Sequence, residues 1–127
     1  MPITFSVDQR RRRIRTKAHG TVTPADVAQF FSDRVSAGVE DFDQIVDISG
    51  ARLMVQEADL RPLANDRNAA LAGLTAGRTA WIAPTDEQFA RAQALKAKLE
   101  TLGVTVAVFR SSADAEAWLD QAPSTLT

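Results

Sequence analysis

Three side chains in this sequence are considered as candidate catalytic groups. They are the single histidine, His19, and Asp47 and Ser49 in the segment VDISGARLMVQEADL, residues 46–60. A histidine that acts as a general base must lie within hydrogen-bond reach of a nucleophile or an orienting carboxylate. No motif pairs His19 with such a partner, and it stands beside Gly20 at the end of a charged segment. A surface or turn role is therefore favoured for His19, and we expect no catalytic residues and no enzyme.

Ser49 follows a short apolar segment and precedes Gly50, where a strand would give way to the next helix. Such a serine could be a nucleophile, a phosphorylation site or a turn residue. These residues alone leave all three roles open.

Metal and phosphate sites are not expected either. One histidine and no cysteine cannot build a zinc site from the usual nitrogen and sulfur ligands. Asp47, Asp86 and Asp114 lie near predicted strand ends and could hold magnesium, but capping or turn roles explain each of them equally well. Gly73 and Gly77 follow a helix rather than a strand, so they do not form a phosphate-binding loop. We predict no cofactor.

A basic segment, Arg10 to Arg15, could attract nucleic acid or an acidic lipid surface. On a strand, however, alternate residues face opposite sides, and exposed strands carry charge to prevent association between sheets. The net charge is −1, and no aromatic residues are interleaved to stack on bases. A solvated hairpin without nucleic-acid binding is favoured.

The composition, 45% hydrophobic and 24% charged over 127 residues, is that of one ordinary globular domain. No apolar run approaches the roughly 20 residues that span a bilayer, so no stable membrane insertion is expected. The first residues, MPITFSVD, have no basic segment followed by an apolar one, and we expect a cytoplasmic protein.

Periodicity and capping residues define the expected elements. Strands are expected at residues 3–7, 11–20, 42–48, 78–84 and 104–110, and helices at 23–38, 57–77, 85–103 and 112–122. The first helix has Thr23 as its N-cap and ends at Gly38, with an apolar stripe of Val27, Phe30, Phe31 and Val35. Pro62 must lie in the first turn of the second helix, and Ser112 is the expected N-cap of the last.

The order β-β-α-β-α-β-α-β-α predicts an α/β fold, because strands that alternate with helices pair in parallel through right-handed crossovers. We expect a mixed, mostly parallel five-stranded sheet flanked by four helices, with the first strand antiparallel. Residues 1–122 form a single domain in this interpretation, and residues 123–127 form a polar C-terminal tail.

The order of elements, with the segments IVDISGARL, RTAWIAP and VTVAVFRSSADAEAWL, resembles the STAS/SpoIIAA-like superfamily. More closely, it resembles a bacterial branch of small stand-alone proteins labelled STAS/SEC14-like. The resemblance covers nearly the whole chain. It implies a regulatory or protein-interaction module like the anti-sigma-factor antagonists, and the SEC14 part of the label implies a carrier or sensor of a small apolar or lipid-like ligand.

In the anti-sigma-factor antagonists, a second Asp-Ser-Ser-Gly motif at the next helix start carries the serine that a partner kinase phosphorylates. Aligning DISGARLMVQEA places Asp47, Ser49 and Gly50 on the first, structural motif. The second motif then falls on residues 55–58, Val-Gln-Glu-Ala, which contain no hydroxyl. The resemblance therefore implies that Ser49 satisfies a turn at a strand end, and that the phosphorylatable serine motif is missing. Glu57 places a fixed negative charge near the expected phosphate, although any helix N-terminus favours such a charge.

Two hypotheses follow. A non-catalytic module would bind an unidentified protein partner through Ser49, Gly50, Arg52, Gln56, Glu57 and Asp59. Alternatively, an apolar pocket would hold a small ligand, because Leu53, Met54 and Val55 form an apolar patch in a connecting segment. The expected pocket residues are Phe31, Leu53, Met54, Val55 and Trp81. A homodimer is compatible with either hypothesis.

Overall fold

The computed structural model describes residues 2–121. Its strands are β1 (Ile3–Asp8), β2 (Arg13–Val22), β3 (Asp43–Leu53), β4 (Thr79–Ile82) and β5 (Val106–Phe109). Its helices are α1 (Pro24–Ala37), α2 (Glu57–Leu71), α3 (Asp86–Thr101) and α4 (Ser112–Asp120). The expected element order is confirmed. The proposed tail, residues 123–127, lies outside the described residues.

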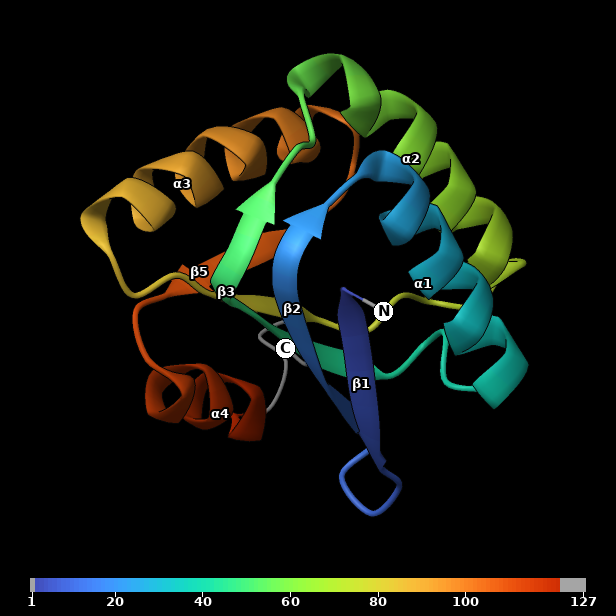
Figure 1. The fold of residues 1–127 in the computed structure, drawn as a ribbon. Coiled ribbons are helices and arrows are strands. Elements are labelled where there is room, and N and C mark those ends of the chain that lie inside the picture. The colour runs from blue at the N-terminus through green and yellow to red at the C-terminus, as the bar shows by residue number, and fades with distance from the viewer. Residues whose placement is uncertain (1, 122–127) are drawn as a thin grey trace.

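The five strands form one sheet in the order β1-β2-β3-β4-β5. β1 and β2 pair antiparallel as a hairpin, and all other neighbours pair in parallel, which confirms the predicted mixed α/β sheet. Helices α1, α2 and α3 cover one face of the sheet and α4 covers the other, as Figure 1 shows. The four helices are therefore divided three to one between the two faces.

Helix α1 begins and ends where its capping residues predict. The hydroxyl of Thr23 accepts a hydrogen bond from the backbone N–H of Asp26, and the Asp26 carboxylate accepts one from the backbone N–H of Thr23. Gly38 adopts a left-handed φ of 70° at the C-terminus. Val35, expected in the apolar stripe, is exposed, and Arg34 is buried in its place. Arg34 is tolerated there because its guanidinium donates to the carbonyls of the loop that follows.

Other boundaries differ from the sequence-based expectation. β2 continues through Gly20 to Val22, because its register against β3 shifts between Lys17 and His19 and the pairing then resumes. α2 ends at Leu71 rather than near Gly77. Ser111, not Ser112, caps α4, and its hydroxyl accepts from the backbone N–H of Asp114 at 3.2 Å.

The basic segment is not a freely solvated hairpin. Arg13 is only 3% exposed, because its side chain lies under α4. Its guanidinium donates to Glu116 at 2.6 Å and to Asp120 at 3.0 Å, and Arg15 Nε donates to Glu116 at 2.7 Å. These contacts hold the lone helix of this face against β2. The hydrogen bond from Arg15, followed by that from Arg13, lowers the pKa of Glu116.

Glu116→Gln should lower the free energy of unfolding by about 1–3 kcal/mol at pH 7, because the buried Arg13 charge loses its closest partner. Chemical denaturation would measure this. The difference from wild type should persist above the ordinary glutamate pKa of about 4.3 and vanish as pH falls through the lower folded-state value, because protonation then removes the same charge. Glu100→Gln, which breaks the surface pair with Lys96, is the control and should change stability by less than about 0.5 kcal/mol. Equal effects of the two variants would contradict this account.

Candidate functional site

A cavity of about 170 Å³ lies between the sheet and the three helices of the larger layer. Strands β2, β3, β4 and β5 form its floor, and α1, α2 and α3 form its walls. Protein interiors rarely contain voids much larger than a water molecule. A space of this size is therefore an unusual feature of a small domain.

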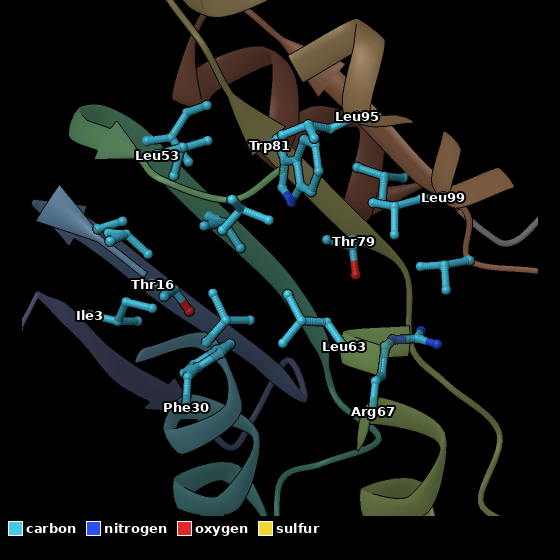
Figure 2. Close-up of a pocket in the computed structure, with 18 of the residues that line it drawn as sticks. Ile3, Thr16, Phe30, Leu53, Leu63, Arg67, Thr79, Trp81, Leu95 and Leu99 are labelled. Carbon is cyan, nitrogen blue, oxygen red and sulfur yellow. The ribbon is translucent and has the colours of Figure 1, made fainter. Parts of the chain in front are cut away.

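The lining of the cavity is mostly aliphatic and aromatic. Leu60 and Leu63 come from α2, Leu95 and Leu99 from α3, and Phe30 from α1. Figure 2 shows these helices' side chains and Trp81 of β4 directed into the space above the strands. Such a wall favours apolar ligands and gives little binding energy to polar ones.

Four of the five residues expected to form a pocket lie on this wall. They are Phe31, Leu53, Val55 and Trp81. Met54 differs from that expectation, because it is 43% exposed and does not line the cavity. Successive residues of an extended chain point to opposite sides, so Leu53 and Val55 turn inward together and Met54 turns outward.

Three polar side chains lie on the otherwise apolar floor. Thr16 of β2, Gln44 of β3 and Thr79 of β4 are 2%, 7% and 6% exposed. Gln44 and Thr79 are register partners on neighbouring strands, and the Gln44 amide hydrogen-bonds the Thr79 hydroxyl at 3.3 Å. The Thr16 hydroxyl and the other end of the Gln44 amide have no partner among the described residues. We call Thr16, Gln44 and Thr79 the polar row.

Arg67 reaches the same cavity from α2. Leu60, Leu63, Ala64, Arg67 and Leu71 share the face of α2 that packs on the sheet, by their three- and four-residue spacing. Arg67 thus occupies a position where the pattern requires an apolar residue. Burial lowers the pKa of Arg67, because the apolar surroundings disfavour its charged form.

Arg34 provides a contrast to Arg67. Its guanidinium donates to the carbonyls of Val39, Glu40 and Phe42. Burial first, and then the neighbouring Arg67 charge, lower the pKa of Arg34 to about 10. The side chain of Arg67 has no hydrogen bond or ion pair within residues 2–121. Glu40 lines a small adjoining pocket with both arginines, but it forms no ion pair with Arg67.

The predicted partner surface lies at the end of the cavity where Leu53 and Val55 line it. Ser49, Gly50, Arg52, Gln56 and Glu57 are exposed, and Asp59 is half-buried. Ser49 lies inside β3 at the register shift rather than at the end of the strand. Its backbone N–H donates to Asp47 at 2.9 Å, so the carboxylate rather than the serine hydroxyl stabilises this irregularity.

Helix α2 begins on this surface, and α3 contacts the same segment. Gln56 is the N-cap of α2, and its backbone N–H donates to the Asp59 carboxylate at 2.8 Å. From α3, Gln88 donates to the carbonyl of Ser49 at 2.8 Å and Arg91 donates to that of Val55. These contacts fix residues 49–56 between two helices.

The remaining candidate residues are scattered. His19 is exposed and pairs in register with Gly50, while Asp86 forms an ion pair with Arg110 at 2.8 Å. Asp114 lies in the first turn of α4 on the opposite face of the sheet from the cavity. The described residues contain no cluster of three or more histidine or acidic side chains that could hold a metal. In that part of the chain, no helix is both long and apolar enough to cross a membrane.

Sequence reasoning did not identify Arg67 or the polar row. The available signal was the α2 pattern, in which an arginine interrupts an apolar stripe at Leu60, Leu63 and Leu71. The polar row carried no signal of its own, because an isolated threonine or glutamine is common on any strand. Only the pairing of β3 and β4 brings Gln44 and Thr79 together.

Ala64→Leu should leave the free energy of unfolding unchanged or raise it by about 0.5–1.5 kcal/mol, because the added carbons enter existing space. Ala64 lies on the cavity wall and is buried. Ala92→Leu is the matched control, because Ala92 is fully buried and is not among the residues that line the cavity. It should lower stability by about 1–3 kcal/mol through overpacking. If denaturant titrations show the same loss of unfolding free energy in both variants, this would argue against an open space beside Ala64.

No protein-family model matches the sequence, and no curated protein matches it. Solved structures do match the fold. A protein of the DUF3478 family with a SpoIIAA-like fold, from Shewanella loihica PV-4, aligns with a TM-score of 0.60 at 18% identity, over 92% of this chain and 93% of its own. The anti-sigma factor antagonist SpoIIAA in its unphosphorylated form aligns with a TM-score of 0.56 at 14% identity, over 94% of this chain and 99% of that one.

The phosphorylated form of the Bacillus cell fate determinant SpoIIAA also aligns, with a TM-score of 0.51 at 17% identity. It covers 91% of this chain and 99% of its own. Identities this low carry information about the backbone and not about the site. The chain has a SpoIIAA-like α/β fold, as the family resemblance implied.

Proposed function

We propose that this protein is a non-catalytic regulatory module that binds a small apolar molecule in the cavity beneath α1, α2 and α3. The observation that carries the proposal is the 170 Å³ space in the core of a small domain. An apolar cavity of about 150 Å³ binds benzene, so this one has room for on the order of six to eight carbons.

The cavity has a route to solvent. Ile3, Val27 and Leu53 line it and are only half-buried, so its wall includes partly exposed side chains from β1, α1 and β3. A ligand can therefore enter without unfolding the domain. Exchange of this kind suits a sensor or carrier better than a permanently bound structural group.

A binding role fits the chemistry of the lining better than catalysis does. General acid–base catalysis requires a titratable group placed against the reacting atoms. The described lining contains one charged residue, Arg67, and no histidine or carboxylate. The SpoIIAA-like fold supports a regulatory role, since SpoIIAA is an anti-sigma factor antagonist.

The direct test is a calorimetric titration of delipidated protein with 1-octanol. We expect saturable 1:1 binding by wild type and at least about a tenfold loss of affinity in Ala64→Leu, because the leucine occupies the ligand's space. Ala90→Leu, at an exposed position of α3, is the control and should bind as wild type does. Absence of binding by wild type, or equal binding by Ala64→Leu, would refute the proposed ligand site.

The surface formed by residues 49–59 supports a second role, recognition of a protein partner. The exposed side chain of Met54 lies between Leu53 and Val55, which line the cavity. A ligand that displaces Leu53 and Val55 would therefore also shift Met54 on the outer surface. Partner binding at this surface could in this way depend on whether the cavity is occupied. The two hypotheses drawn from the sequence are then compatible with one another.

Glu57→Lys should abolish partner binding at this surface while leaving stability and 1-octanol affinity unchanged, because Glu57 is exposed at the start of α2. Quantitative crosslinking in an extract of the source cells would compare it with wild type. Asp114→Lys reverses a charge in the first turn of α4, on the opposite face of the sheet, and should have no effect. A crosslinked partner that is lost equally in both variants, or in neither, would refute the role of this surface.

A further inference from the structure

We propose that the ligand of this cavity is a short aliphatic monocarboxylate, with its carboxylate bound by Arg67, Gln44 and Thr79 and its chain lying along the apolar wall. This inference rests on the proposed function, and it specifies the chemical class of the ligand. It predicts that this mostly apolar cavity binds a negatively charged ligand more tightly than a neutral ligand of the same chain length.

The first support is the position of Arg67. It interrupts the apolar face of α2, where leucine or alanine would pack better against the sheet. Taking a guanidinium out of water is unfavourable unless an anion or several acceptors compensate it. Arg34 has such compensation from three loop carbonyls, whereas Arg67 has none within the described part of the chain. A bound anion would supply it.

The second support is the polar row. The Thr16 hydroxyl is buried and has no hydrogen-bond partner among the described residues. Gln44 Nε2 donates to the Thr79 hydroxyl, whereas Gln44 Oε1 is unpaired. Buried polar groups are normally paired, so the two unpaired atoms, Thr16 Oγ1 and Gln44 Oε1, indicate a ligand with a polar end. An ionised carboxylate accepts hydrogen bonds only, so the Thr79 hydroxyl and the second N–H of Gln44 Nε2 can donate to it, and Gln44 Oε1 cannot.

The arrangement separates a polar end from an apolar end. In Figure 2 the guanidinium of Arg67 lies on the Thr79 side of the cavity, away from Leu53. Gln44 and Thr79 lie at the amino ends of β3 and β4, whereas Leu53 ends β3 at its carboxyl end. A carboxylate at the first end would direct its aliphatic chain toward Leu53 and Trp81.

Charge and shape favour a carboxylate over a phosphate. One guanidinium balances one negative charge, and its planar fork matches the two oxygens of a carboxylate. A phosphate monoester carries between one and two charges near neutral pH and has three oxygens to satisfy. No second unpaired cation lines the described cavity, since the neighbouring Arg34 donates to carbonyls and lines only the small adjoining pocket.

Calorimetric titrations at pH 8 with octanoate and 1-octanol would test this, using delipidated wild-type protein. The two probes have the same chain length and differ in the charged end. We expect octanoate to bind about tenfold more tightly or better, since a charge-assisted hydrogen bond replaces a neutral one. Arg67→Met should abolish that preference while keeping 1-octanol binding, because methionine extends the apolar wall. Thr79→Val, which removes a hydroxyl donor at the Arg67 end of the cavity, should weaken octanoate binding several-fold and leave 1-octanol binding unchanged.

Two controls make the comparison specific. Arg61→Met changes an exposed arginine of the same helix and should keep the octanoate preference. Arg67→Lys retains the positive charge without the planar guanidinium and should keep part of that preference. It also serves as the test if the methionine variant folds poorly.

Equal or tighter binding of 1-octanol by wild type, or an octanoate preference that survives in Arg67→Met, would overturn the carboxylate site and leave the proposed function standing. Tighter binding of octyl phosphate than of octanoate would overturn the assignment of the headgroup. Binding of neither octanoate nor 1-octanol would overturn both proposals.

Discussion

The structure depends on one constraint: the central strands of a parallel sheet must be covered on both faces. Four helices are available, and three of them cover one face, so a single nine-residue helix, α4, must cover the other. That helix succeeds because small residues such as Ala80 and Ala115 let it approach, and because Arg13 links β2 to Glu116. On the other face, the three helices do not fill all of the space above the sheet. The space that they leave is the cavity.

Two buried arginines, Arg13 and Arg34, and the half-buried Arg67 show how the fold uses charges that are removed from water. Arg13 is paired with carboxylates of α4, and Arg34 is satisfied by carbonyls of the loop after α1. Both therefore stabilise the join between two elements. The side chain of Arg67 forms no hydrogen bond or ion pair within residues 2–121, although it lies at the wall of the cavity. The bound anion proposed above would give it the partner that the described residues do not.

Local chemistry explains how much could be predicted from the sequence. The order of elements and the limits of α1 followed from Thr23, Pro24 and Gly38, because capping involves residues close in the chain. The mixed, mostly parallel sheet followed from the alternation of strands and helices, and the SpoIIAA-like fold was implied by the family resemblance. The burial of Arg13 could not be predicted, because it depends on contacts more than 100 residues away in the sequence. The contact between Gln44 and Thr79 likewise exists only after β3 and β4 have paired.

The central claim is that the space under the three helices receives a small molecule. Methyl-resolved NMR of the delipidated protein during a titration with 1-octanol tests this most directly. The account predicts saturable shifts for the methyl groups of Leu63, Leu95 and Leu99, which line the cavity, and none for Leu119, which packs on the other face of the sheet. Shifts of Leu119 as large as those of the lining residues, or no shifts at saturating 1-octanol, would contradict it.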